Sequence, residues 1–261
     1  MSKQQARKLG LELLTAAAML LAAGAAGAGG KIYSYYTRPL AVDEHTFALW
    51  RFDEAEVTNR HKDAGPYGLD LLGYGGNTCP GRYSNGMWFS SGQYISNANY
   101  AVWNTLTNEL TVELWMKLKS VTVNNGSARS IFNRQPWAWS SWNRPFLLHL
   151  AGVGSNQTEM VNLRWTVRNE RVDATATNLG TSWHHVMATC DVPNQILKLY
   201  LDGAQVGSYP YQLTRIPTNY YSVMLPTAIG DGTAEAYFDE LRISNAVRVP
   251  APPSGSVIVV R

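Results

Sequence analysis

The chain has 261 residues, enough to bury a full hydrophobic core within one large domain. Charged residues make up 16% of it, below the roughly 25% of an average soluble domain, whereas Trp, Tyr and Gly are abundant, as in aromatic strands joined by tight turns. Of the net charge of +3, the first thirty residues carry +2 (three basic side chains against one acidic one), so the near-neutral remainder argues against the clustered basic face that nucleic acid requires.

The amino-terminal segment combines a basic start with an apolar run. Lys3, Arg7 and Lys8 precede 18 uncharged residues, from Leu13 to Gly30. This pattern predicts one hydrophobic helix within residues 1–30 that delivers the rest of the chain outside the cytoplasm. The residues expected to form a membrane anchor there are Leu13, Leu14, Ala18, Leu20, Leu21, Ala22 and Gly24.

The sequence leaves two fates open for this segment. Small residues between Ala23 and Ala28 fit a signal-peptidase site, which predicts cleavage and secretion. A retained transmembrane anchor is favoured over cleavage, because the apolar run can span a bilayer and tyrosines follow it at 33, 35 and 36. Its Ala/Gly-rich surface would permit close packing against helices of membrane protein subunits, with the remainder on the periplasmic or extracellular side.

Residues 31–43 read as a linker, 44–248 as the folded body and 249–261 as a Pro-rich tail. The body consists of strand-like segments in which apolar and polar residues alternate, separated by turn residues, with no convincing amphipathic helix. Asp202 and Gly203 lie between two such segments and predict a two-residue hairpin. The body is therefore predicted to be all-β, and the alternation is interpreted as placing four bulky side chains in its core, namely Trp50, Trp88, Trp115 and Trp183.

Eight short segments between residues 45 and 247 follow one another in a recognisable order. They are Leu49–Asp53, the turn at Asp63 and Gly65, Gly86–Phe89 with Tyr94–Ile95, Val112–Trp115, Trp183–Val186, Leu199–Gly203, Ile229–Gly230 and Phe238–Ser244. This order resembles a laminin-G-like jelly roll of the concanavalin A-like lectin/glucanase superfamily. The resemblance implies a two-sheet antiparallel jelly-roll sandwich, which stacked sheets with alternating faces also require.

Some members of that superfamily are glycoside hydrolases, which carry alternating carboxylates along one strand. This chain departs from that pattern: Glu109 and Glu113 lie four residues apart, and Asp239 and Glu240 are adjacent. We therefore predict a protein that is not an enzyme. Laminin-G-like domains commonly bind calcium, so a structural calcium ion is the only cofactor considered, and its candidate ligands are Asp63, Asp70, Asp231 and Asp239.

Two further residue types could carry chemistry. Cys79 and Cys190 could form a disulfide in an exported chain, whereas Cys190 on an apolar strand could equally be a small buried residue. His184 and His185 are adjacent, so on a regular strand they point to opposite sides, which predicts structural roles rather than a shared metal.

The most unusual stretch is the segment 133–145, which we call the Trp loop. It holds three tryptophans within six residues between two arginines, and these residue types dominate binding surfaces. The predicted partner-binding or glycan-binding residues are Trp137, Trp139, Trp142, Arg134 and Arg144, and the alternative is that the indoles bury one another. Two functions follow: a non-catalytic, membrane-anchored accessory subunit of a cell-envelope complex that contacts protein subunits, or a secreted or displayed carbohydrate-binding lectin.

Overall fold

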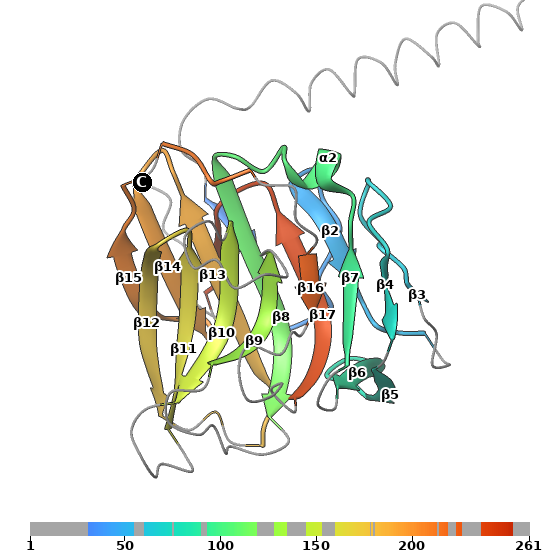
Figure 1. The fold of residues 1–261 in the computed structure, drawn as a ribbon. Helices are drawn as coiled ribbons and strands as arrows, with labels where there is room; N and C mark the ends of the chain where they lie inside the picture. The colour runs from blue at the N-terminus through green and yellow to red at the C-terminus, as the bar shows by residue number, and fades with distance from the viewer. Residues whose placement is uncertain are drawn as a thin grey trace, which may run out of the picture. The chain divides into compact units, whose positions relative to one another are not determined.

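The computed structural model describes residues 31–54, 60–74, 76–89, 93–118, 128–134, 145–152, 160–177, 179, 181–212, 214–218, 223–225 and 236–252. The chain divides into two units, Met1–Lys31 and Ile32–Arg261. The second unit is almost entirely β, and two sheets lie face to face in it (Figure 1). The predicted all-β sandwich is therefore confirmed.

We call the two layers sheet I and sheet II, and neighbouring strands within each are antiparallel. In spatial order, sheet I contains β12 (Glu170–Thr177), β11 (Met160–Val167), β10 (Phe146–Gly152), β9 (Ala128–Arg134), β16 (Val223–Leu225), β7 (Tyr94–Asn97), β4 (Leu71–Tyr74) and β3 (Arg60–His61). Sheet II contains β15 (Ala204–Pro210), β14 (Ile196–Leu201), β13 (His184–Asp191), β8 (Glu109–Leu118), β17 (Ala236–Ser244), β6 (Asn85–Phe89) and β5 (Asn77–Pro80), with β2 (Thr46–Trp50) also paired to β17. A single helical turn, α2 (Tyr100–Trp103), precedes β8.

The core lies between the sheets and follows the period of two along each strand. On β8, every second side chain from Leu110 to Leu118 faces this core and is almost completely buried. On β10, the same is true of Phe146, Leu148 and Leu150. The intervening residues of β8 therefore lie on the outer face of sheet II, the side turned away from sheet I.

Two turns explain how the strands are joined. Asp202 and Gly203 have φ values of 48° and 83° between β14 and β15, as expected of the predicted two-residue hairpin. In the turn after β2, the Asp63 carboxylate accepts hydrogen bonds from the backbone N–H groups of Leu49 (2.8 Å), Gly65 (2.7 Å) and Leu69 (2.8 Å). Asp63 is thus occupied in holding the turn together.

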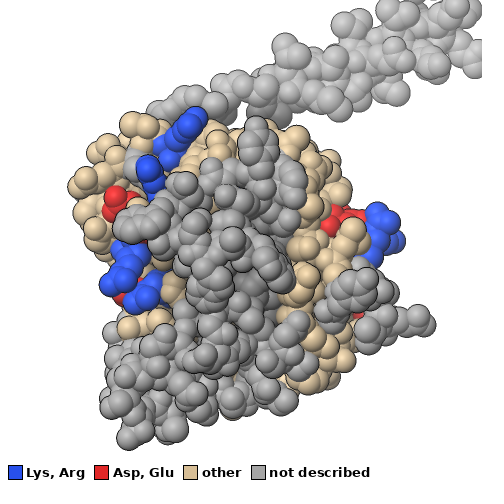
Figure 2. All heavy atoms as spheres, viewed as in Figure 1, with Lys and Arg blue, Asp and Glu red and all other residues tan. Residues whose placement is uncertain are grey.

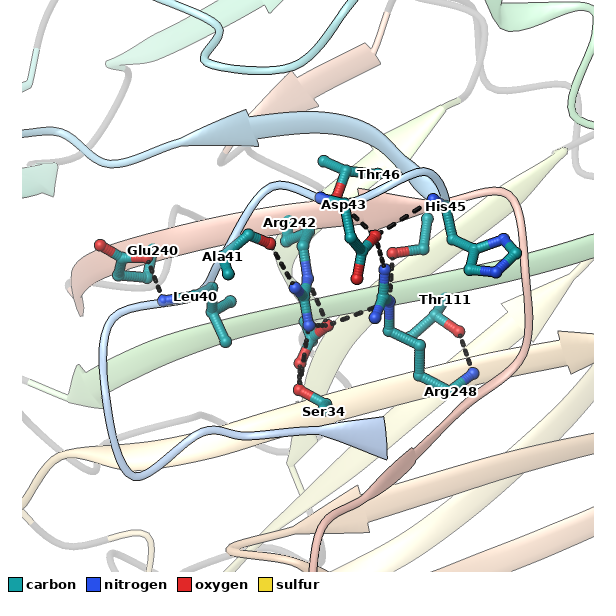
Figure 3. A network of polar contacts seen from close by, with 12 residues as sticks. Ser34, Leu40, Ala41, Asp43, His45, Thr46, Thr111, Glu240, Arg242 and Arg248 are labelled. Atoms are coloured by element: carbon teal, nitrogen blue, oxygen red, sulfur yellow. Dashed lines mark hydrogen bonds and ion pairs between the residues drawn. The ribbon is translucent and has the colours of Figure 1, made fainter. Parts of the chain in front are cut away.

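The segment expected to be a linker is part of the folded unit. Ile32–Ser34 form β1, which pairs in parallel with β18 (Arg248–Pro250), and the rest of the segment to Asp43 is bonded to the outer side of sheet II. Residues of β17, β8 and β18 supply its partners, as Figure 3 shows. Sequence reasoning overlooked this because the partners are 79 to 208 positions away and the segment itself has no strong periodicity.

Within the described part of the chain, no helix is long and apolar enough to cross a bilayer. The predicted anchor residues Leu13 to Gly24 lie outside that part, as do residues 253–261 of the predicted tail.

Candidate functional site

One half of the outer face of sheet II carries a buried group of charged side chains. We call it the ionic network, and its members are Ser34, Asp43, Glu113, His185, Arg242 and Arg248. All but Asp43 are essentially inaccessible to solvent. They come from β1, the following segment, β8, β13, β17 and β18, so the network joins most of the layer.

Glu113 is the centre of this network. Its Oε1 accepts a hydrogen bond from Arg242 Nε (2.8 Å), its Oε2 lies 3.2 Å from His185 Nε2, and the Ser34 hydroxyl donates to the same carboxylate. Burial alone would raise the pKa of Glu113, but the charge of Arg242 and the hydrogen bonds outweigh it and lower the pKa to about 2. The carboxylate is therefore ionised at any physiological pH.

The segment that covers the network is bonded to it at several points. Arg242 donates to the backbone carbonyl of Ala41 (2.7 Å), and Arg248 pairs with Asp43 (Figure 3). Tyr36 stacks on the imidazole of His185, with ring centroids 4.6 Å apart and planes inclined by 11°. These contacts close the ionic half of the face to solvent and give it a structural role.

The other half of the same face carries aromatic side chains instead. Strand register places Asn77, Trp88, Tyr237 and Lys117 side by side across β5, β6, β17 and β8, and Trp183 lies just before β13 beside Lys117. We call these five residues the aromatic row. Adjacent strands are about 4.8 Å apart, so the row extends about 19 Å, long enough for several sugar rings.

The members of the aromatic row touch one another but are not fully covered. The rings of Trp88 and Tyr237 have centroids 6.4 Å apart, and Lys117 Nζ lies 4.6 Å from the Tyr237 centroid and 5.4 Å from that of Trp183. Each of the five side chains is half-buried. The row thus offers flat aromatic surface and one cation on an accessible side of the sheet.

The tryptophan assignments need correction here. Trp50 lies in the core as predicted, but Trp88, Trp115 and Trp183 do not, because their neighbours Met87, Leu114, Met116 and Val186 occupy the inward positions. Trp115 is buried on the outer face, between the ionic network and the aromatic row. The signal was available, since the alternation of Leu110 to Leu118 already sends Trp115 and Lys117 outward.

Beside Trp115, a buried carboxyl separates the two halves of the face. Asp239 pairs with Trp115 across the strands, is inaccessible to solvent, and accepts a hydrogen bond from Tyr83 N–H on Oδ2 (2.8 Å). Its Oδ1 has no partner among the residues described. Burial raises the pKa of Asp239 to about 7, reinforced by the negative charges of Glu240 and Asp53 and opposed by the hydrogen bond from Tyr83.

A separate hollow of about 560 Å³ lies at the edge of the sandwich, between β12 and β15. Its lining residues are Asn169, Arg171, Val172, Asp173, Ser208 and Tyr209. The Asp173 carboxylate already binds both Arg164 and Arg171, and Figure 2 shows such small mixed-charge groups, not a basic stripe, on the described surface of this side. Among the described residues of this lining Tyr209 is the only aromatic one, so they offer less stacking surface than the aromatic row.

A family model described as the concanavalin A-like lectin/glucanases superfamily, of the laminin-G type, matches residues 89–251. The chain belongs to this superfamily. The match begins at the last residue of β6, so the laminin-G-like domain as folded extends beyond it to β1. No curated protein gives a significant sequence match.

Solved structures share the fold of this laminin-G-like domain at low identity. Domain 4 of AbnA, an extracellular arabinanase from Geobacillus stearothermophilus, in complex with arabinotriose, is 18% identical with a TM-score of 0.52, covering 77% of this chain and 92% of that one. The binding domain of Paraclostridial Mosquitocidal Protein 1 is 14% identical with a TM-score of 0.56, covering 77% and 49%. The binding domain of botulinum neurotoxin DC, in complex with SialylT, is 10% identical with a TM-score of 0.54, covering 78% and 48%. The chain thus spans about half the length of these toxin domains.

Most of the predicted binding residues of this laminin-G-like domain lie outside the described residues: Trp137, Trp139, Trp142 and Arg144. Arg134 is described, and it ends β9 as a fully buried side chain. Its guanidinium donates to the Trp103 carbonyl (2.8 Å) and to Asn104 Oδ1, and burial lowers its pKa to about 10. Arg134 therefore braces the sandwich and does not point into an open loop.

Of the predicted calcium ligands, Asp63 and Asp70 lie in one turn, where Asp63 N–H donates to Asp70 Oδ1 (2.8 Å), and Asp239 lies on β17. Asp63 holds its turn, Asp70 binds Arg60, Asp239 faces Trp115, and Asp231 lies outside the described residues. Across the described ranges, no three His, Cys, Asp or Glu side chains gather as metal ligands would. The histidine pair has separate partners, since His184 lies 2.7 Å from Asp202 Oδ2 and His185 binds Glu113.

The remaining carboxylates and thiols that sequence reasoning considered also have structural surroundings. Glu240 accepts hydrogen bonds from Arg51 and from Leu40 N–H, and burial together with the nearby Asp191 raises the pKa of Glu109. Cys79 and Cys190 are free thiols: Cys190 faces the core and Cys79 is half-buried on β5. Among the carboxyls considered for hydrolysis, Glu113 and Glu240 are buried in ion pairs and Asp239 is buried as well.

Proposed function

We propose that this laminin-G-like domain is a non-catalytic carbohydrate-binding module that works outside the cytoplasm and holds its glycan on the aromatic row. The observation that carries the proposal is the placement of Trp88, Tyr237 and Trp183 on one accessible row of sheet II, with Lys117 between two of the rings. Flat aromatic faces stack on the apolar faces of sugar rings, and half-buried side chains need little reordering on binding.

The superfamily and its neighbours support this choice. Lectins are part of the superfamily's description, and one solved structure of the same fold contains arabinotriose. Pairing of the Glu113 and Glu240 carboxylates inside the domain supports a binding role rather than hydrolysis. We propose no cofactor; because the Asp63 and Asp70 carboxylates already bind backbone N–H groups and Arg60, and Asp239 lies apart on β17, addition of EDTA is expected to leave the melting temperature and glycan binding unchanged.

A glycan array followed by calorimetric titration of the best ligand tests the proposal. We expect Trp183→Ala and Trp88→Ala each to weaken binding about tenfold, as truncation of a central aromatic contact does. Tyr209→Ala and Tyr67→Ala are the matched controls, because both tyrosines are exposed and lie away from the row. Glycan binding that depends on Tyr209 and not on Trp183 would move the site to the hollow between β12 and β15.

The Trp loop is proposed as an alternative glycan site, because Arg134 at its start binds Trp103 and Asn104 before β8, whereas Lys117 of the aromatic row lies at the far end of β8. The triple variant Trp137→Ala, Trp139→Ala and Trp142→Ala is expected to weaken binding of a glycan held there, and Arg144→Ala to do so slightly. If the triple variant abolishes binding while Trp183→Ala leaves it unchanged, the loop and not the aromatic row is the glycan site.

The second candidate function is a membrane-anchored accessory subunit of a cell-envelope complex. The apolar run with its Ala/Gly-rich surface, including Ala18, Ala22 and Gly24, favours it, because small residues let helices approach closely. Extraction of the full-length chain in mild detergent should then recover membrane protein subunits, and intact mass should retain Met1 or Ser2. A mature amino terminus near Lys31 would instead support a secreted lectin.

A further inference from the structure

Two cations lie on aromatic rings at the open half of the outer face of sheet II. Lys117 Nζ lies between Tyr237 and Trp183, and the Arg82 guanidinium lies 4.7 Å from the ring centroid of Trp115 and 5.3 Å from that of Tyr83. Trp115 and Lys117 are two residues apart on β8 and point to the same side, so their Cα atoms are about 7 Å apart. Arg82 therefore lies over the outward residue of β8 next to Lys117.

Neither cation is neutralised by the part of the domain that the structure describes. Lys117 and Arg82 contact rings there, without an acidic partner, whereas Arg51, Arg164, Arg242 and Arg248 each bind a carboxylate. If Lys117 and Arg82 served only to pack the domain, carboxylates could pair with them as they pair with the four other arginines. Positive charge held in place on an aromatic surface is suited to a negatively charged ligand that also has flat faces.

The carboxyls nearby do little to cancel this charge. Asp239 lies beside Trp115, is inaccessible to solvent, and accepts a hydrogen bond from Tyr83 N–H on Oδ2. Glu240 is buried and paired with Arg51, and Asp53 accepts a hydrogen bond from Asn85 N–H. With a pKa near 7, Asp239 retains part of its proton at neutral pH. The accessible surface of the aromatic row is therefore cationic.

We infer that the aromatic row binds an acidic polysaccharide, with uronate rings stacked on Trp183 and Tyr237 and a ring carboxylate paired to Lys117. Arg82 receives the carboxylate of a neighbouring uronate. This inference rests on the proposed carbohydrate-binding function and adds the ligand class. An acidic protein segment would supply negative charges for Lys117 and Arg82, but it has no sugar rings to stack on the aromatic side chains.

The test compares two probes that differ only in charge: hexagalacturonate and its fully methyl-esterified form, titrated into the full chain by calorimetry. Lys117→Met retains the apolar stem and removes the charge, Lys117→Arg retains the charge, and Arg82→Gln removes the second cation. Lys198→Met is the matched control, since Lys198 lies on the same sheet two strands from β8. Poly-glutamate serves as a polyanion without rings.

We expect hexagalacturonate to bind more tightly than its ester, with affinity that falls as salt rises. Lys117→Met should weaken hexagalacturonate binding about fivefold and leave the ester unaffected, and Lys117→Arg should restore most of the affinity. Trp183→Ala should weaken both probes.

Three outcomes would overturn the inference. If acid and ester bind equally and Lys117→Met changes neither, the ligand is a neutral glycan and the proposed function survives. If poly-glutamate binds as tightly as hexagalacturonate with the same dependence on Lys117, sugar rings are not recognised. If no glycan shows binding that depends on Trp183 or Trp88, the proposed function fails as well.

Discussion

The outer face of sheet II has two halves that share the strands β8 and β17 but differ in what covers them. In one half, the segment from Ile32 to Asp43 covers Glu113, His185 and Arg242, and their charges are paired within the protein. In the other half, Trp88, Lys117 and Tyr237 are half-buried, and Lys117 lies on aromatic rings without an ion-pair partner among the described residues. Cover by this segment, rather than residue type, therefore distinguishes the paired half from the half proposed to bind glycan.

Removal of the Glu113 carboxylate, at the centre of the covered half, should have the largest effect on stability. Glu113→Ala leaves Arg242 buried without a counter-charge, so we expect the free energy of unfolding to fall by about 3–5 kcal/mol. Chemical denaturation measures this, with Glu44→Gln as the control because the Glu44 side chain is 82% exposed. The double variant Glu113→Leu with Arg242→Met should lose much less than the single one. An equal or greater loss would mean that the pair itself stabilises the fold.

Asp239 lies between the two halves, and its protonation should make the stability of the domain depend on pH. Its pKa of about 7 is raised above the ordinary 3.8, so the folded state binds the proton more tightly than the unfolded state. Stability should therefore decrease as pH rises from about 4 to about 7, by an amount on the order of 3 kcal/mol. Asp239→Asn should remove this decrease and be the more stable protein at pH 8, as measured by denaturation at several pH values. Parallel curves for the two proteins would contradict the assigned pKa.

Glu113 should act in the opposite direction at lower pH. Because its pKa is lowered to about 2, the stability that it contributes is complete above pH 4.5 and is lost as pH falls from there towards 2. Wild type should thus be destabilised in this acid range, while the Glu113→Leu, Arg242→Met double variant should show a flatter profile.

Substitution of Gly203 should disturb the segment that covers the ionic network without changing a charged residue, and its effect should be smaller. A Cβ at Gly203 would lie 2.1 Å from the Tyr36 hydroxyl, and the residue has φ of 83°. Gly203→Ala should displace Tyr36 from His185 and lower stability by about 1–2 kcal/mol. Gly68→Ala separates the two causes, because Gly68 has φ of 60° but nothing within 4 Å of its Cβ position. Equal losses for the two variants would show that the contact with Tyr36 is irrelevant.

Substitutions in the open half should affect glycan binding more than stability. Trp183→Ala is expected to change the free energy of unfolding by less than about 1 kcal/mol, since the side chain is only half-buried, while weakening glycan binding. Thermal denaturation and titration on the same preparation check this. A large loss of stability would show that Trp183 has a structural role, like the residues of the covered half.

The β-sandwich could be predicted from the sequence because the apolar positions of β8, from Leu110 to Leu118, alternate without interruption. The Asp202–Gly203 turn was equally readable, since its residues tolerate positive φ. The face of each tryptophan was misjudged because residue size was allowed to outweigh alternation: Trp115 and Trp88 were placed inward although Leu114 and Met87 already filled those positions.

The ionic network could not be read from the sequence for a different reason. Glu113 and Arg242 are 129 residues apart, and Ser34 is 208 positions from Arg242, so their meeting depends on strand order and on a segment that has no strand pattern of its own. The aromatic row has the same origin, as Trp88, Lys117 and Tyr237 come together only through register. The Trp loop stays a prediction.

The hydrogen bonds of Ser34, Leu40 and Asp43 make the segment before β2 part of the sandwich. A shortened chain that begins at residue 44, or one cut to the 89–251 span, would expose Glu113 and Arg242 to water and remove strands from the sandwich. Recombinant versions should therefore retain residues from Lys31 onward, and poor solubility of shorter ones would reflect lost packing rather than an unstable domain.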